Sequence, residues 1–404
     1  MNIADSNTLH DCTSCQMCAA VCPTGAISIA LDADGFYRPT VDAAKCVDCS
    51  LCTSVCYKYD GNVLVSGSLD NETIYGAKAL DSELVEATTS GGIADVLARC
   101  LIKQGYKCIG VCYDTEHAVA YHAVASTERE TVGFRGSKYI QSYTFEAFKQ
   151  LVANCKKEKY AIFGLPCQVY AIHRYLEKRR CRDNHILIDL YCHGTPSMHI
   201  WRKYNNEMRL ATRQLHFDAV NFRSKVKGWG NFYVVEVVVD GVKVFISSKK
   251  KDEFYTLFFS DVALNGSCYD CKLRSTLRYT DIRLGDFWGK TYVDDHKGVS
   301  AVSVVTDRGR ALFGAIKDEI MCAKHSYKDF LPYQSYGKVY QRNDKLRDIV
   351  FSQLRDEKTE LKEVIKTIYQ NQSMKQRMRR HIKNIVNLLP IGIIACIKKL
   401  YYKL

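Results

Sequence analysis

Proline and long apolar runs are scarce in this chain of 404 residues. Only 6 prolines occur, and hydrophobic residues make up 47% and charged residues 25% of the chain. This composition excludes a Pro-rich or low-complexity disordered protein and is that of a globular one. The first ten residues, MNIADSNTLH, contain no apolar segment, so we expect no secretory signal peptide.

Acidic residues are absent after Glu363, although the net charge of the chain is +13. Nine positive charges lie beyond that residue, which leaves only +4 for the rest: Lys366, Lys375, Arg377, Arg379, Arg380, Lys383, Lys398, Lys399 and Lys403. Most of the net positive charge therefore lies in the C-terminal segment. A general nucleic-acid-binding surface on the body of the protein is disfavoured.

Cysteine, in contrast, is abundant, with 19 in the chain. The first 60 residues contain the pattern C-x2-C-x2-C-x3-C twice, at 12–22 and at 46–56. This spacing is typical of two [4Fe–4S] clusters in which the fourth cysteine of each pattern binds the other cluster. We therefore predict one cluster on Cys12, Cys15, Cys18 and Cys56. We predict the second on Cys46, Cys49, Cys52 and Cys22.

The alternatives for these eight cysteines are structural zinc and disulfides. Zinc sites use two separated pairs of ligands, which triplets at two-residue spacing do not suit. Disulfides are disfavoured, because a long chain for which we expect no signal peptide does not resemble a small disulfide-bonded scaffold. Thiolates that bind iron need a reducing compartment, so we expect a cytoplasmic protein. Residues 10–57 resemble bacterial dicluster ferredoxins, except that Tyr57 stands where a proline often follows the last cysteine, as Pro23 does in the first pattern.

Periodicity divides the chain into three parts. Residues 1–60 form an α+β ferredoxin-type module with a hairpin at 27–41, and residues 62–78 read as a connection. Residues 61–340 alternate helices and strands, which predicts an α/β domain with a mixed, mainly parallel sheet. We expect helices at 88–105, 144–160, 169–180 and 308–316, strands at 108–114, 118–126, 161–168, 185–194, 281–289 and 300–307, and an antiparallel hairpin at 233–248. Residues 341–404 read as a helical, basic tail.

Several sparse motifs follow one another in the second part: TTSGG (88–92), RGSKYIQS (135–142), GLPCQVYAI (164–172), LYCHGTPS (190–197), KGW (227–229), CYDC (268–271) and RYTDIRLGDFWG (278–289). With them the chain is similar, over nearly all of residues 10–310, to the beta-subunit family of coenzyme F420-reducing hydrogenase and F420H2 dehydrogenase. The resemblance implies FAD in the α/β domain and clusters that carry single electrons. Plant 7-hydroxymethyl chlorophyll a reductase is similar to this family and uses ferredoxin, so the resemblance leaves the substrate open.

The candidate FAD site begins at Ser90, Gly91 and Gly92, whose backbone N–H groups precede a helix and can point at a phosphate. Arg135 and Lys138 add positive charge for the pyrophosphate or for an anionic substrate. The alternative for the Ser-Gly-Gly turn is an ordinary helix cap with tight packing. The alternative for the two basic residues is a position on a solvated face. No G-x-G-x-x-G fingerprint follows the strands, so a nicotinamide-type site has no support.

Four further cysteines and one histidine complete the candidate site. Cys268 and Cys271, with Cys192 and Cys167 at the ends of expected strands, can form a third four-thiolate cluster. A zinc site or non-ligating cysteines are the alternatives, and Cys167 can instead lie against the isoalloxazine ring. His193, beside Cys192 at the end of the same expected strand, is the candidate proton carrier for hydride chemistry at a flavin.

Together these features predict an iron–sulfur flavoprotein oxidoreductase that acts on an organic substrate or a deazaflavin. Its redox partner would be a ferredoxin or an F420-type coenzyme, because a flavin couples a two-electron substrate to one-electron clusters. The alternative is a noncatalytic electron-transfer subunit of a larger redox complex.

The C-terminal segment 375–404 places a mostly apolar run, 385–397, between cations. Such a run is shorter than the ~20 residues that span a bilayer. It suits a peripheral position at the inner face of the membrane, where lysines meet anionic lipid. A terminal helix that packs on the protein body or on a partner subunit is the alternative.

Overall fold

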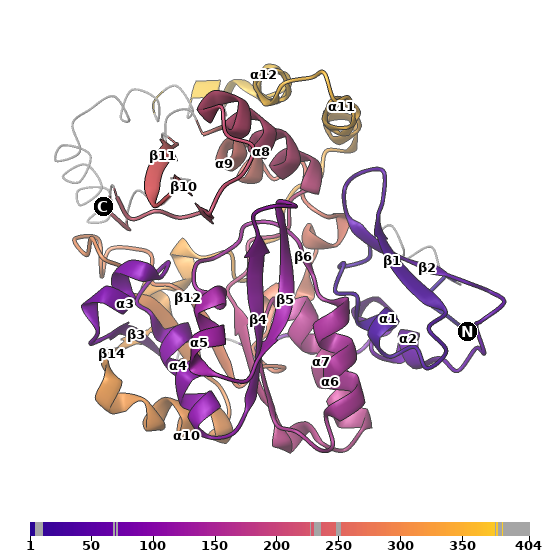
Figure 1. Cartoon of the computed structure of the whole chain (residues 1–404), viewed down its shortest axis with the longest axis vertical. Coiled ribbons are helices and arrows are strands. Elements are labelled where there is room, and N and C mark those ends of the chain that lie inside the picture. The colour runs from indigo at the N-terminus through magenta and orange to yellow at the C-terminus, as the bar shows by residue number, and fades with distance from the viewer. Residues whose placement is uncertain are drawn as a thin grey trace.

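The computed structural model describes residues 1–4, 11–67, 69, 72–226, 228–229, 236–247, 252–375, 377–378 and 382. A large mixed sheet forms the centre of the molecule, the N-terminal module lies beside it, and a mostly helical layer covers one end (Figure 1). The predicted α/β domain with a large mixed sheet is confirmed, and it follows the N-terminal module in the chain.

The N-terminal module contains little regular structure besides its hairpin. The strands β1 (Ile27–Leu31) and β2 (Tyr37–Val41) pair antiparallel, as predicted, and the carboxylate of Asp32 accepts hydrogen bonds from the backbone N–H groups of Asp34 and Phe36 in the turn. Two one-turn helices, α1 (Met17–Ala20) and α2 (Leu51–Ser54), and the 3-10 turn η2 (Tyr57–Tyr59) follow the cysteine loops.

Nine strands form the central sheet in the order β14-β3-β13-β12-β8-β7-β4-β5-β6. The four central strands β12, β8, β7 and β4 run parallel to one another. The pairs β4–β5, β12–β13, β13–β3 and β3–β14 are antiparallel. The short edge strand β6 also pairs parallel with β5, so the sheet is evenly mixed, and the expectation of a mainly parallel sheet holds for its centre but not for the whole. The strands are β3 (Thr73–Ala79), β4 (Lys107–Asp114), β5 (Val119–Ala125), β6 (Ser142–Tyr143), β7 (Tyr160–Gly164), β8 (Ile186–Leu190), β12 (Ile282–Asp286), β13 (Ser300–Val304) and β14 (Ile320–Ser326).

Helices cover both faces of this sheet (Figure 1). On one face α3 (Ser82–Ala87), α4 (Ile93–Lys103) and α10 (Asp307–Ala315) bury a core against β4, β8, β12 and β13, with the short α5 (Glu128–Thr131) nearby. On the other face α6 (Phe145–Asn154) and α7 (Pro166–Lys178) pack on β7 and β8 and also contact α1 of the N-terminal module. The result is a three-layer α/β/α domain.

A separate, mostly helical layer covers the end of the sheet at which β4 ends. It consists of α8 (Met198–Thr212), α9 (Glu253–Phe258), α11 (Asp344–Arg355), α12 (Leu361–Gln370) and a small antiparallel sheet of β9 (Ala219–Asn221), β10 (Glu236–Val239) and β11 (Val242–Ile246). Trp201, Phe254 and Phe351 are among its buried side chains. The predicted hairpin at Asp240 and Gly241 is confirmed, and both residues have positive φ.

The helices α11 and α12 belong to this core, so residues 344–370 of the expected tail pack against the body of the protein. The apolar run 385–397 and its flanking cations from 383 onward lie outside the described residues. Among the residues that the structure describes, no helix has the length and apolar character needed to cross a membrane.

Two sequence-based expectations for single elements are corrected. The residues expected to be a connection contain β3, whose alternating apolar side chains are interrupted by Gly76 and Lys78 and so give a weak strand pattern. Cys167 does not end a strand, because β7 ends at Gly164 and Pro166 begins α7. Proline favours the first position of a helix, because a backbone N–H at that position has no hydrogen-bond partner within the helix.

Two buried glutamines connect the N-terminal module to the sheet domain. The side chain of Gln16 donates to the carbonyl oxygen of Ser142 and accepts from the backbone N–H groups of Thr144 and Phe145. The side chain of Gln141 donates to the carbonyl oxygens of Gly35 and Pro196 and accepts from the N–H of Tyr37. Because buried polar groups must be paired, these bonds fix the relative position of the two parts.

Candidate functional site

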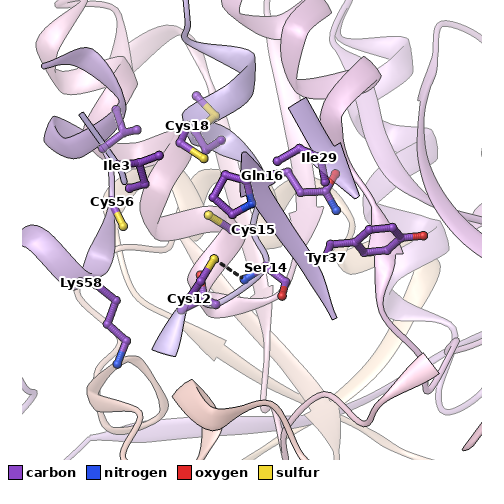
Figure 2. A pocket seen from close by; sticks show the side chains of 14 residues that line it. Ile3, Cys12, Ser14, Cys15, Gln16, Cys18, Ile29, Tyr37, Cys56 and Lys58 are labelled. Carbon is purple, nitrogen blue, oxygen red and sulfur yellow. Dashed lines mark hydrogen bonds between the residues drawn. The ribbon is translucent and has the colours of Figure 1, made fainter. Parts of the chain in front are cut away.

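The structure brings the first predicted set of cysteines together around one cavity. Cys12, Cys15, Cys18 and Cys56 all line it, and their sulfur atoms face the same space (Figure 2). Three of them come from the loop before and within α1, while Cys56 immediately precedes η2. The fourth cysteine of the second pattern thus lies with the first three of the first pattern, as the exchanged ligand arrangement requires.

The acid–base properties of these thiols fit a positively charged iron–sulfur core. Burial, together with the neighbouring cysteines, raises the pKa of Cys15 to about 11 and that of Cys56 to about 12. The pKa of Cys18 is raised by burial and by the nearby Cys15 and Cys12. Four thiolates in one buried cavity repel one another, and a metal centre that binds them compensates this cost and releases their protons.

The second predicted set is closer to the surface. Cys52 is buried, Cys22 and Cys46 are half-buried, and Cys49 is exposed. Cys52 and Cys22 belong to one apolar cluster with Cys18 and Cys56, so the two cysteine sets adjoin. The side chain of Cys49 reaches solvent, which places this set at the outer end of the module.

The remaining four candidate cysteines line a second cavity. Cys167 lies on the first turn of α7, Cys192 follows β8, and Cys268 and Cys271 lie in the loop that precedes β12. Burial raises the pKa of Cys192 to about 12, and the neighbouring Cys268 also raises it. Cys167 and Cys192 follow adjacent parallel strands, so sheet topology places them at the same edge.

The two cavities are neighbours. Thr13 lines both, and the charge of a Cys15 thiolate is close enough to raise the pKa of Cys167, although burial is the larger cause. A redox centre in one cavity would therefore lie next to a centre in the other.

Two polar groups support the second cavity. Arg274 lines the cavity, and its guanidinium donates to the carbonyl oxygens of His193, Cys268 and Lys338. Burial raises the pKa of Cys192 and of Cys271, and the positive charge of Arg274 opposes this rise. The Thr195 hydroxyl lies 3.4 Å from the Cys268 sulfur. Hydrogen bonds and charges of this kind tune iron–sulfur centres.

Within the described ranges, no three His, Cys, Asp or Glu side chains are arranged around a single metal ion. A cubane differs from such a site, because its four thiolates surround a cluster of four irons. The two cysteine cavities fit this larger group in ligand number and type.

Ser90, Gly91 and Gly92 follow α3 at the same end of the sheet, and Gly92 is the N-cap of α4 with φ of 82°. The Gly91 N–H does not point at a ligand, because it donates to the Ser300 hydroxyl. A Cβ at Gly91 would lie 2.3 Å from the carbonyl oxygen of Ala77, so this glycine is required for close packing on β3. The buried Ser90 hydroxyl has no hydrogen-bond partner within the described residues.

The two predicted basic residues differ in their surroundings. Arg135 pairs with the carboxylate of Asp95, with Nε 2.7 Å from Oδ1. Lys138 donates to three carbonyl oxygens, those of Val111, Gly133 and Arg135, and forms no ion pair with a carboxylate of the described chain. Burial lowers the pKa of Lys138 to about 8.

Lys225 was not predicted, and its side chain contacts Ser90. Its Nζ donates to the carbonyl oxygens of Ser90, at 2.8 Å, and of Val85, at 2.5 Å. Burial lowers its pKa to about 8, and no described carboxylate forms an ion pair with it. The motif KGW begins two residues later, but no local pattern indicates that this segment folds back onto the Ser-Gly-Gly turn.

His193 lies beside the second cavity and does not line it. Its Nε2 is 2.7 Å from the Asp261 carboxylate, and its Nδ1 is 3.0 Å from the Tyr340 hydroxyl and 3.3 Å from the Ser335 hydroxyl. Phe258 also packs on the ring. The imidazole thus connects a tyrosine hydroxyl to a carboxylate that is 30% exposed.

Asp286 at the end of β12 holds basic and aromatic groups together. One carboxylate oxygen accepts from Arg223 and the other from the Trp229 indole N–H at 3.0 Å. Trp229 stacks on Trp288 with ring centroids 4.3 Å apart, and the guanidinium of Arg223 lies over the Trp288 ring.

Comparisons with known proteins agree with the motifs. Residues 157–329 match the family described as the C terminus of the coenzyme F420 hydrogenase/dehydrogenase beta subunit, and residues 11–58 match a 4Fe-4S dicluster domain. The family resemblance predicted from the sequence is confirmed by these matches, and the prediction of [4Fe–4S] clusters in the N-terminal module is supported by the second.

Two curated relatives and one solved structure are similar to the chain. It is 23% identical over 325 residues to the F subunit of F(420)H(2) dehydrogenase from Methanosarcina mazei, covering 77% of this chain and 84% of the relative. It is 29% identical over 126 residues to the beta subunit of coenzyme F420 hydrogenase from Methanococcus voltae, covering 30% of this chain and 45% of that protein. A chain of the F420-reducing [NiFe] hydrogenase complex from Methanosarcina barkeri aligns with a TM-score of 0.42 and 17% identity, over 73% of this chain and 89% of that one.

Proposed function

Because the chain joins a domain of the coenzyme F420 hydrogenase/dehydrogenase beta-subunit family to a 4Fe-4S dicluster domain, we propose that it is an iron–sulfur flavoprotein oxidoreductase. It would pass electrons between [4Fe–4S] clusters and FAD, and so reduce or oxidise an organic substrate or an F420-type deazaflavin. The observation that carries the proposal is the pair of adjacent four-cysteine cavities. The second cavity lies where the parallel strands end, which is where α/β sheets bind their ligands.

The cysteine sets define the order of the electron route. Cys49 of the outer set is exposed and faces a redox partner, and the set of Cys12 lies between it and the cavity of Cys167. A third [4Fe–4S] cluster on Cys167, Cys192, Cys268 and Cys271 would continue the route to the edge of the sheet.

The FAD diphosphate would be held at this edge by Lys138, Lys225 and the hydroxyl of Ser90. Two half-buried ammonium groups that form no ion pair with a described carboxylate, and a buried hydroxyl without a described partner, fit an anionic ligand. A bound flavin supplies the conversion between a hydride and two single electrons. Arg135 would act indirectly, since its guanidinium is paired with Asp95 and its carbonyl oxygen accepts a hydrogen bond from Lys138.

His193 remains our candidate proton carrier. Its contacts with Tyr340 and Asp261 form a hydrogen-bonded route from the protein interior to a partly exposed carboxylate. His193→Asn should slow turnover with substrate while leaving iron and flavin contents unchanged; a turnover rate equal to that of the unaltered protein would remove the residue from the mechanism.

The test of the proposed function is anaerobic purification followed by measurement of iron, sulfide, zinc and flavin in one sample. About eight irons and one FAD per chain support two clusters with a flavin, and about twelve irons add the third cluster, since each cubane contains four irons. Eight irons without flavin, even after FAD is supplied, would contradict the flavoprotein and favour the alternative below. About one zinc per chain in place of the last four irons would assign the second cavity to zinc.

The substrate is tested separately. If the chain oxidises F420H2, anaerobic mixing should transfer a hydride to the bound flavin and bleach its absorbance. No bleaching with F420H2, together with reduction by a ferredoxin, would assign a one-electron partner instead.

A noncatalytic electron-transfer subunit is the second candidate, because both curated relatives are named as subunits. It predicts clusters without a stoichiometric flavin and a complex with a separate catalytic chain on gentle purification.

The basic C-terminal segment supports peripheral contact with anionic membranes, a proposal that depends on sequence alone. Full-length protein should sediment with anionic vesicles at low salt, and a chain ending at residue 374 should remain in the supernatant. Equal sedimentation of both chains would contradict this contact.

A further inference from the structure

Tyr57 is the one residue at which the second cysteine pattern departs from a ferredoxin, and it lies between the two cysteine cavities. It directly follows Cys56, begins the turn η2, and is only 7% exposed. Pro23, at the same place in the first pattern, is exposed. Within one chain, therefore, the residue after the fourth cysteine is an exposed proline in the first pattern and a buried tyrosine that packs against the α/β domain in the second.

The hydroxyl of Tyr57 connects the first cavity to the loop of the second. It accepts a hydrogen bond of 3.0 Å from the backbone N–H of Lys272, the residue after Cys271. A buried tyrosine hydroxyl usually finds such a partner, and proline has no atom that can replace it. One side chain thus bridges the neighbours of two candidate cluster ligands.

The ring of Tyr57 reaches a third candidate ligand. It packs edge-on against Tyr170 of α7, with ring centroids 5.9 Å apart, and α7 carries Cys167 on its first turn. Tyr57, Tyr170 and Leu273 form a small apolar cluster that also includes Cys167 and Cys271. The contacts of the ring and of the hydroxyl therefore fix Cys56 relative to both of these cysteines.

We propose that Tyr57 is a positioning residue that holds the Cys12, Cys15, Cys18 and Cys56 cluster at a fixed separation from a cluster on Cys167, Cys192, Cys268 and Cys271, and so sets the rate of electron transfer between them. The inference rests on the proposed function, because both clusters belong to it. Electron transfer between two centres slows steeply with their separation, so a side chain that fixes this separation controls the rate.

The test compares three variants as holo-proteins. Tyr57→Pro restores the ferredoxin residue and removes ring and hydroxyl, Tyr57→Phe removes the hydroxyl alone, and Tyr59→Phe is the matched control. Tyr59 lies in the same turn, but its hydroxyl bonds to the carbonyl oxygens of Asn2 and Ile3 within the N-terminal module. Iron content is measured first, so that loss of a cluster is separated from a change in its position.

Two readouts then report the separation of the clusters. One is the magnetic coupling between neighbouring reduced clusters in the EPR spectrum, and the other is the rate of flavin reduction after rapid mixing with a one-electron reductant. With iron content unchanged, Tyr57→Pro should lose the coupling and slow flavin reduction by about tenfold or more, as small misplacements of reacting groups do. Tyr57→Phe should change both in the same direction but less, and Tyr59→Phe should change neither.

Unchanged coupling and rate in Tyr57→Pro, with full iron content, would overturn the inference. Should Tyr57→Pro lose iron, Tyr57→Phe decides, and an unaltered spectrum in that variant also overturns it. Only about eight irons in the unaltered protein would instead refute the third cluster and with it the inference, whereas eight irons with one FAD would still support the proposed two-cluster flavoprotein.

Discussion

At the scale of single residues, Lys138 and Lys225 determine the electrostatics of the candidate flavin site. Both lysines are half-buried, and their ammonium groups donate to carbonyl oxygens, which have partial negative charge but do not neutralise a cation. Burial disfavours the charged form and outweighs the nearby negative charges, Glu86 beside Lys225 among them, so both pKa values fall to about 8. An anionic ligand would supply the missing charge.

Replacing either lysine should therefore weaken FAD binding. We expect Lys225→Met to raise the dissociation constant of FAD by about tenfold or more, because a hydrogen bond to a charged group contributes ~1.5–3 kcal/mol. Lys138→Met should raise it less, because the three N–H groups of Lys138 already donate to carbonyl oxygens and only its charge attracts the diphosphate. Fluorescence titration of flavin-depleted protein measures this. Lys103→Met is the control, since Lys103 is exposed at the far end of α4. Its Nζ lies 3.9 Å from a carboxylate oxygen of Glu128.

The same two groups predict a pH dependence. Below pH 8 the free protein carries both charges, and above pH 8 both lysines lose their protons, so FAD affinity should fall as the pH rises from about 8 to 10. Bound diphosphate raises the pKa values of both lysines. The affinity should therefore begin to fall near the pKa of the free protein and stop falling above the higher pKa of the complex. An affinity that stays constant from pH 7 to 10, in the same titration, would show that neither lysine contacts the ligand.

At the scale of elements, the turn before α4 depends on a glycine for packing. A Cβ at Gly91 would overlap the backbone of β3, whereas a Cβ at Gly314 in α10 would meet no atom within 4 Å. We expect Gly91→Ala to lower the free energy of unfolding by about 1–3 kcal/mol through overpacking. Gly314→Ala should raise it by up to about 1 kcal/mol through helix propensity. Urea denaturation of both variants measures the difference, and equal midpoints would contradict the close contact.

The cysteine loop of α2 should be separable from the flavin site. Cys49 is exposed at the outer end of the N-terminal module, away from the sheet edge that holds Ser90 and Lys225. Cys49→Ser should therefore remove up to about four irons, one cubane, and leave flavin content unchanged. Iron and flavin analysis checks this, and joint loss of flavin and of all iron would show that the two parts fold only together.

At the scale of the whole molecule, the N-terminal module is attached by buried polar contacts as well as by apolar packing. Gln16→Met keeps the volume of the side chain but leaves the carbonyl oxygen of Ser142 and the N–H groups of Thr144 and Phe145 without their partner. Each buried unpaired group costs ~1–3 kcal/mol, so the variant should unfold at a clearly lower temperature. Gln150→Met, at an exposed position of α6, is the control, and equal melting temperatures would contradict the role of Gln16.

Much of the local structure followed from the sequence. The hairpins at 27–41 and at Asp240 and Gly241, and most strands of the sheet, were predictable because alternation and turn residues are local signals. The strand β3 and the start of α7 were not. A short strand with Gly76 and Lys78 has no clear pattern, and Pro166 can end a strand or begin a helix.

The sequence by itself determined the two ferredoxin-type cysteine patterns, because three ligands of a cubane come from a single tight loop and their spacing is visible in the chain. Only the tertiary structure decided that Cys167, Cys192, Cys268 and Cys271 share a cavity, that Lys225 lies against Ser90, and that Tyr57 connects the two cavities. These groups are far apart in the chain. The order of the strands and the loops at their ends bring them together, and no local spacing encodes that order.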